Sequence, residues 1–192
     1  MQLPQLARQI DAFYLEMGET FSQAQARANL NCLPNCGRCC TTPEIEASLW
    51  EMLPMAYAID RQGRSEEILN ELLATQGPTC WAYQAKGEEK GSGQCRQYAD
   101  RPTVCREFGV AGLRDKNGGI RLSVCKYIRE ENPQQTVLAE NTIAQWAPPI
   151  MNEWVMRLMQ LHPSILHERR PINLALAEAL NKVLLYKGLN YS

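Results

Sequence analysis

The chain has 192 residues, of which 45% are hydrophobic, 21% charged and 7% aromatic. This length is sufficient to bury a hydrophobic core, so we expect a single domain over residues 1–192. The 20 basic and 21 acidic residues leave a formal net charge of −1, which gives no support for a nucleic-acid partner or for binding to an acidic membrane. The sequence shows neither an apolar run of the roughly 20 residues that span a bilayer nor a signal peptide, so we expect a soluble, cytoplasmic protein.

The first third of the chain is predicted to be helical. Apolar residues at helical spacing predict a long amphipathic helix over 4–29. Thr42-Pro43 predicts the start of a second helix, which Pro54 should kink or break, and residues 65–74 predict a third. The polar, glycine-rich stretch 84–94 is predicted to be a solvated loop.

A short helix and a β-hairpin are predicted next. Asp100 is a suitable N-cap, Pro102 suits the first helical position and Gly109 suits the end of the helix. The segments 110–114 and 120–124 flank the sequence Asp-Lys-Asn-Gly-Gly, which is typical of a hairpin turn. A hairpin there would bring the following cysteine, Cys125, back toward Cys105.

The last third again has helical patterns, over 134–146 and 150–161, and a final helix is expected to begin at Pro171. The predicted fold class is therefore mainly α with one small β-hairpin. Its helices should pack around a cysteine-rich metal-binding centre in region 30–127, with the C-terminal helices over 134–187.

The eight cysteines all lie in the middle of the chain. They are Cys32, Cys36, Cys39, Cys40, Cys80, Cys95, Cys105 and Cys125. A reducing cytosol would keep them as free thiols, which favours thiolate metal ligation over disulfides. Four cysteines within nine residues also argue against scattered cysteines that act as small hydrophobic side chains.

The first four cysteines have informative spacing. Cys36 and Cys39 form an ordinary chelating pair, and Gly37 between them is expected to adopt positive φ and to offer its N–H to a sulfur. Adjacent side chains diverge, so Cys39 and Cys40 seldom serve one tetrahedral ion. This pair indicates a polynuclear cluster, two nearby centres, or one ligand beside a redox-active or packing thiol.

Basic side chains accompany the cysteines. Arg38, Arg96, Arg106 and Lys126 are each next to a cysteine, where a cation is expected to lower the thiolate pKa. The guanidinium of Arg101 could bind a carboxylate, a backbone carbonyl or a ligand anion, or could hold its own loop in place. Arg101 and Arg106 are our candidate cofactor-binding residues. We identify no catalytic residue, because no hydrolytic motif is present and it stays open whether the chain is an enzyme.

Two segments together resemble a known family. They are Cys32-Leu-Pro-Asn-Cys36-Gly-Arg-Cys39-Cys40 and Gln94-Cys95-Arg96-Gln97-Tyr98-Ala99-Asp100-Arg101-Pro102-Thr103-Val104-Cys105-Arg106-Glu107-Phe108. This combination resembles the YkgJ-type cysteine-cluster proteins, the CxxCxxCC zinc- or iron-chelating domains, over about residues 32–125. The first gap here is three residues and not two. The resemblance implies metal binding by the eight-cysteine set but no particular reaction, although a larger relative, a flagellin lysine N-methylase, has a similar cysteine-rich region.

The sequence leaves the metal open between an iron–sulfur cluster and zinc. Two Cys₄ zinc sites would use all eight cysteines and would stabilise the fold. The adjacent cysteines and the x₃–x₂ spacing, which is similar to that of radical SAM loops, slightly favour a cluster. Three function classes follow: a cluster protein for redox or sensing, a zinc-stabilised interaction module, and a SAM-dependent methylase-like enzyme.

Overall fold

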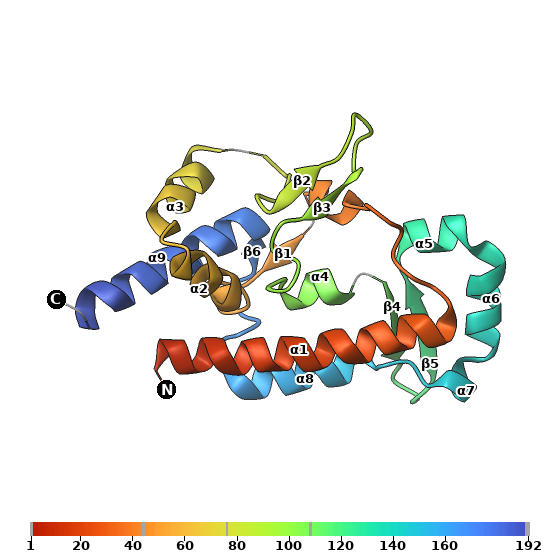
Figure 1. Cartoon of the computed structure of the whole chain (residues 1–192). Coiled ribbons are helices and arrows are strands. Elements are labelled where there is room, and N and C mark those ends of the chain that lie inside the picture. The colour runs from red at the N-terminus through yellow and green to blue at the C-terminus, as the bar shows by residue number, and fades with distance from the viewer. Residues whose placement is uncertain (1, 44, 76, 108, 191–192) are drawn as a thin grey trace.

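The protein is represented by a computed structural model that describes residues 2–43, 45–75, 77–107 and 109–190. It is mainly helical with small two-stranded antiparallel sheets, which confirms the predicted fold class (Figure 1). Within these residues, no helix is both long enough and apolar enough to cross a membrane.

The long N-terminal helix is confirmed as α1, Leu3–Ala28. Pro4 lies in its first turn, where a missing N–H costs no helical hydrogen bond, and Asn29 ends it with a left-handed φ of 50°. One face of α1 is buried along its whole length, because apolar residues recur there every three or four positions, as at Ile10, Tyr14 and Met17.

The predicted helix from Thr42-Pro43 is wrong. That segment follows a 3₁₀ turn, η1 (Arg38–Thr41), and leads into a short strand, β1 (Glu46–Ala47). The next helix is α2, Leu53–Arg61, and Pro54 lies in its first turn, so this proline starts a helix instead of breaking one. The third predicted helix is confirmed as α3, Ser65–Ala74.

The structure has more β pairs than the one predicted hairpin. The predicted pair is confirmed as β4 (Val110–Arg114) and β5 (Ile120–Val124). A second hairpin pairs β2 (Tyr83–Ala85) with β3 (Gly93–Cys95), so the ends of the predicted solvated loop are strands.

Two further short elements are a strand near the C-terminus and a helix in the middle of the chain. The strand β1 pairs with β6 (Arg170–Pro171). The short helix α4, Thr103–Glu107, begins directly after Pro102.

Five helices complete the chain after β5. They are α5 (Lys126–Glu131), α6 (Pro133–Asn141), α7 (Ile143–Trp146), α8 (Met151–Leu161) and α9 (Ile172–Asn190). The pattern predicted as one helix over 134–146 is thus divided at Thr142, and the last two helices are confirmed.

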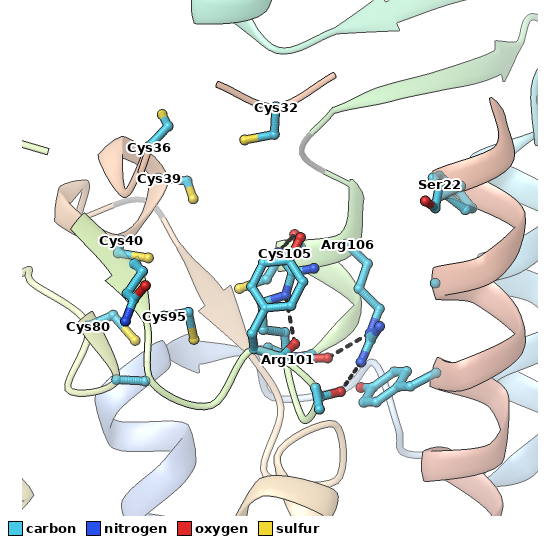
Figure 2. A pocket seen from close by; sticks show the side chains of 18 of the residues that line it. Ser22, Cys32, Cys36, Cys39, Cys40, Cys80, Cys95, Arg101, Cys105 and Arg106 are labelled. Atoms are coloured by element: carbon cyan, nitrogen blue, oxygen red, sulfur yellow. Dashed lines mark hydrogen bonds between the residues drawn. The ribbon is translucent and has the colours of Figure 1, made fainter. Parts of the chain in front are cut away.

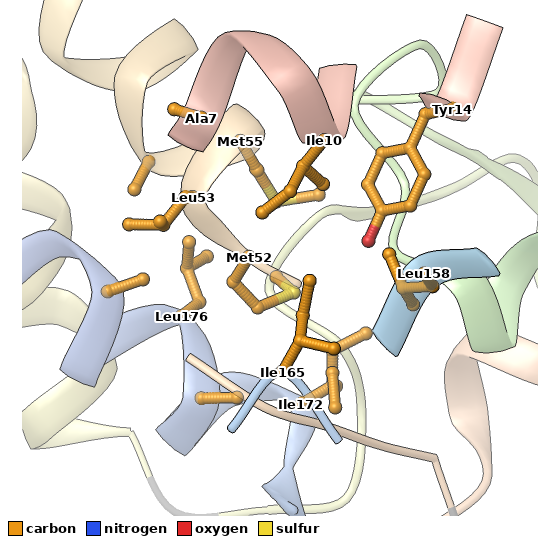
Figure 3. Close-up of a cluster of buried hydrophobic side chains, with 14 of the residues drawn as sticks. Ala7, Ile10, Tyr14, Met52, Leu53, Met55, Leu158, Ile165, Ile172 and Leu176 are labelled. Carbon is orange, nitrogen blue, oxygen red and sulfur yellow. The ribbon is translucent and has the colours of Figure 1, made fainter. Parts of the chain in front are cut away.

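The main hydrophobic core lies between α1, α2, α8 and α9. Figure 3 shows Ile10 of α1, Leu53 of α2, Leu158 of α8 and Leu176 of α9 meeting there, all of them buried. The hydroxyl of Tyr14 reaches into this core and donates a hydrogen bond of 3.0 Å to the backbone carbonyl of Glu51. A smaller apolar cluster fixes the β4–β5 hairpin, so both ends of α1 are held by buried contacts.

Candidate metal centre

Seven of the eight cysteines line one cavity of about 890 Å³. These are Cys32, Cys36, Cys39, Cys40, Cys80, Cys95 and Cys105, and all eight cysteines are free thiols. Figure 2 shows the thiols on one side of the cavity and α1, with Ser22, on the other. The tertiary structure therefore brings together thiols from four chain segments that the sequence separates by up to 73 positions, from Cys32 to Cys105.

Backbone hydrogen bonds hold the first cysteine loop against the β2–β3 hairpin. The N–H of Gly37 donates to Gly91 O at 2.7 Å, and the N–H of Gly93 donates to Asn35 O at 2.8 Å. A third bond of 2.8 Å runs from the N–H of Cys80 to Cys40 O. The middle of the stretch 84–94 is an exposed loop, as the sequence predicts, but its last residues also position the cysteine loop, which the prediction did not include.

Gly37 is required for space and not for positive φ. Its φ is −113°, and its N–H serves Gly91 and not a sulfur, so both expectations for this glycine are wrong. A Cβ at Gly37 would overlap the ring of Tyr83, and a Cβ at Gly93 would overlap the same ring from the hairpin side. The left-handed residue in this loop is instead Asn35, with φ of 54°.

Cys39 lies at the centre of the cysteine group. Its thiol hydrogen-bonds with Cys40, and this bond, followed by burial, raises the pKa of Cys39. The charge of Cys39 also raises the pKa of four other thiols, those of Cys32, Cys80, Cys95 and Cys105. Figure 2 shows Cys39 between Cys32 at one end of the cavity and Cys80 and Cys95 at the other.

Cys125 is outside the residues that line the cavity. At the end of the β4–β5 hairpin, the N–H of Cys125 donates a 2.8 Å hydrogen bond to Gly109 O. Gly109 is close in sequence to Cys105. Its thiol acts electrostatically on Cys32, which lies at the end of the cavity away from Cys80 and Cys95.

Burial is the largest cause of the raised pKa of four thiols. It raises the pKa of Cys32 and of Cys80 to about 11, and it also raises the pKa of Cys95 and Cys105. The expectation that adjacent basic residues would lower these values is wrong in its net direction, because desolvation disfavours a thiolate more than the cations favour it. Metal binding at these thiols must therefore release protons.

The donor set fits the metals that the sequence predicts. Cysteine thiolates are the usual ligands of structural zinc and of iron–sulfur clusters. In the described ranges, however, no three His, Cys, Asp or Glu side chains are already arranged as a metal site. The thiols share a cavity but would have to approach one another to form such a site.

A family comparison agrees with this donor set. Residues 31–135, a span that contains every cysteine, match the family described as "CxxCxxCC: Putative zinc- or iron-chelating domain". The chain belongs to this family. Comparisons with curated proteins and with solved structures find no match. Phe108, the last residue of the second sequence motif, lies outside the described residues.

The two arginines predicted to bind a cofactor occupy different places in this CxxCxxCC protein. Arg101 lies beside the thiols: it weakens the burial effect on the pKa of Cys32, Cys39, Cys95 and Cys105. Its Nε donates to Tyr98 O at 3.0 Å, and its guanidinium lies 3.4 Å from the centre of the Tyr98 ring.

Arg106 faces α1. Its Nε donates to Arg101 O at 2.9 Å, another N–H donates to Ala99 O, and the guanidinium lies 4.7 Å from the centre of the Tyr14 ring. A Cβ at Gly18 would lie 3.0 Å from its Nη1. The sequence did not predict that α1 forms a wall of the cavity. Gly18 was the available signal, because a glycine in the middle of a long helix is unfavourable unless another group packs closely against it.

The other basic residues near the cysteines have partners of their own. Arg38 lies 4.5 Å from the centre of the Tyr127 ring and forms a 3.3 Å ion pair with Glu89. Arg96 lies 4.6 Å from the Trp81 ring. These contacts connect the cysteine loops to neighbouring segments of the CxxCxxCC domain.

Proposed function

We propose that this protein binds a metal centre through its cysteine set, as an iron–sulfur cluster or as zinc. The observation that carries this proposal is the convergence of seven thiols from separate segments on one cavity. Membership of a zinc- or iron-chelating family supports the same function. Our candidate ligands remain all eight cysteines, including Cys125 at the edge of the group.

The mutual interactions of four thiols indicate where the centre would lie. Cys39, Cys80, Cys95 and Cys105 act electrostatically on one another and come from η1, the segment before β2, the strand β3 and the helix α4. We propose these four as the principal ligands. The other four, Cys32, Cys36, Cys40 and Cys125, would support them or form a second set. Cys32 interacts with Cys36 and Cys125, and Cys40 interacts with Cys39.

An iron–sulfur cluster is the first choice for the metal. The adjacent cysteines Cys39 and Cys40 and the x₃–x₂ spacing of the first loop favour a cluster over two independent Cys₄ zinc sites. A bound cluster would supply one-electron redox chemistry or sensing, whereas zinc would supply folding free energy. The cytoplasm is the compartment we propose, because its reducing conditions preserve free thiols.

Metal analysis with a visible spectrum, on protein purified without oxygen, tests this function. Iron with acid-labile sulfide in a brown protein would support a cluster. A colourless protein with bound zinc would support the zinc-stabilised interaction module, the alternative function. Protein that takes up neither metal would overturn the proposal.

Two matched variants test the ligand assignment. Cys39→Ser should abolish metal binding, because it removes the thiol that interacts with both ends of the cavity. Cys125→Ser should retain more metal than Cys39→Ser does, because Cys125 is outside the cavity lining. Equal metal content in Cys39→Ser and the parent protein would contradict the central role of Cys39.

A further inference from the structure

The cavity is larger than a metal centre requires. Its volume of about 890 Å³ lies in the range of roughly 300–1,000 Å³ that is typical of sites for small organic molecules. The thiols occupy one wall, and α1 forms the opposite wall, which includes Leu15, Gly18, Glu19, Ser22 and Gln25. Among these residues only Glu19 carries a group that can ligate zinc, and its side chain is exposed.

Two guanidinium groups line this cavity without a carboxylate partner. In the described part of the chain, six other arginines form ion pairs, but neither Arg101 nor Arg106 does so. Arg106 is only 9% exposed; Tyr14, Cys105 and Asp100 act on it electrostatically, and no described carboxylate forms an ion pair with it. Buried charges in proteins are normally paired, so this positive charge indicates a negatively charged group in the cavity.

The position of Arg101 indicates the kind of anion. Its Nε is used by Tyr98 O, and one terminal nitrogen makes a long 3.5 Å contact with Cys105 O, so the guanidinium retains donors toward the cavity. Ring stacking on Tyr98 holds the guanidinium plane in place. Such a fixed plane suits a carboxylate or a phosphate, each of which can accept two N–H groups.

Charge favours the carboxylate. Metal–thiolate centres are rich in negative charge, so a doubly charged phosphate beside them is repelled more than a singly charged carboxylate. The α1 wall presents the carbon side chain of Leu15 and the polar groups of Ser22 and Gln25, which suits an organic body with a few hydrogen-bonding groups. The Glu19 carboxylate lies on the same wall, so the negatively charged end of the ligand belongs at the arginines and not against α1.

We infer that the cavity binds a small organic carboxylate beside the metal centre, with its carboxylate on Arg101, the positive charge of Arg106 behind it and its organic body against α1. This inference rests on the proposed metal-binding function, because that function assigns the thiol wall to the metal. It adds a second ligand at the same site.

A charged and a neutral probe with the same carbon chain test the inference. Hexanoate and hexanamide are titrated by calorimetry into the metal-loaded protein, and hexyl phosphate serves as the doubly charged comparison. Hexanoate should bind about 10- to 100-fold more tightly than hexanamide, as expected for hydrogen bonds to a charged group. Hexyl phosphate should bind more weakly than hexanoate.

Two arginine variants complete the test. Arg101→Gln should weaken hexanoate binding by about 10- to 100-fold and leave hexanamide binding unchanged. Arg114→Gln is the matched control, because Arg114 is paired with Glu153 and is not among the residues that line the cavity. It should change neither affinity. The metal content of each protein is measured in parallel.

The outcomes separate this inference from the function on which it rests. A metal-loaded protein that binds hexanoate no better than hexanamide, or that prefers hexyl phosphate, overturns the inference alone. Loss of metal from Arg101→Gln also overturns it, because Arg101 would then serve the charge of the metal centre. A parent protein that takes up no metal overturns the proposed function itself.

Discussion

The helical core and the cysteine region are stabilised in different ways. In the core, helices from both ends of the chain bury large apolar side chains such as Ile10, Leu53 and Leu176 (Figure 3). In the cysteine region, the loops are connected by backbone hydrogen bonds and by close approaches at Gly37 and Gly93. Apolar burial is non-directional and depends mainly on area, whereas the loop contacts require one particular geometry.

This difference indicates that the cysteine region depends more on a bound metal than the core does. The thiols are grouped in a cavity but are not arranged as a metal site within the described residues. We propose that both regions still belong to one domain over residues 1–192, because Cys80, Val104 and Cys105 pack against the main core. Local stability can differ within one domain.

Metal removal should give the largest effect and should separate the two regions. Structural zinc–thiolate sites contribute on the order of 10 kcal/mol in small domains, and a comparable contribution here would act mainly on the cysteine loops. Hydrogen exchange before and after chelation should show lost protection at the amides of Gly37, Cys80 and Gly93, with α2 and α9 little changed. Equal loss of protection in α9 would mean that the two regions unfold as one unit.

A substitution in the core should lower the stability of the fold without affecting metal binding. Ile10→Ala removes a fully buried side chain and should lower the free energy of unfolding by about 2–5 kcal/mol, measured by denaturant titration. The metal content of the folded variant should stay unchanged. Leu185→Ala is the control, because that side chain is 60% exposed, and it should have an effect within about 0.5 kcal/mol.

A glycine substitution tests how much the close packing of the cysteine loops contributes to stability and to metal binding. Gly93→Ala would place a methyl group against the Tyr83 ring and Gln84 O, so it should lower stability by about 1–3 kcal/mol and weaken metal binding. Gly188→Ala is the control, since its new methyl group meets no atom within 4 Å and favours the helix. If Gly93→Ala binds metal as tightly as the parent, the close approach of the two loops is not needed for the site.

The smallest effect is expected at Glu51, a buried carboxyl group beside the core. Burial raises its pKa, so the neutral form is favoured in the folded protein. The stability that the neutral Glu51 carboxyl group contributes is fully present below the unfolded pKa near 4.5. It is lost as the pH rises through the folded pKa. Glu51→Gln should therefore stabilise the metal-free protein at pH 7 by on the order of 1 kcal/mol, with no gain at pH 4.

Exposed Glu19→Gln provides the reference for this measurement. Thermal unfolding of both variants and of the parent, at several pH values, separates the effect of burial from that of charge removal alone. A Glu51→Gln variant that is less stable than the parent at pH 7 would show that the hydrogen bond from Ser48 to the carboxylate outweighs burial.

Several elements were predictable because they depend on local patterns. The helix α3 and the β4–β5 hairpin match their predicted bounds, since apolar periodicity and turn residues act over a few positions. The segment after η1 was wrongly predicted to be helical because β1 forms only by pairing with β6, more than a hundred residues later. Local propensity contains no information about such a partner.

The sequence by itself determined the mainly helical fold, the chemical nature of the site and the family, since thiol spacing and helical periodicity are local properties. Only the tertiary structure decided that Cys125 lies outside the cavity that the other seven thiols line, that Arg101 lies beside them and Arg106 against α1, and that Gly37 is needed for space. It also decided that the buried thiols have raised pKa values beside these cations. The physical reason is that burial and close approach depend on which distant segments pack together, and the desolvation that follows outweighs the charges adjacent in sequence.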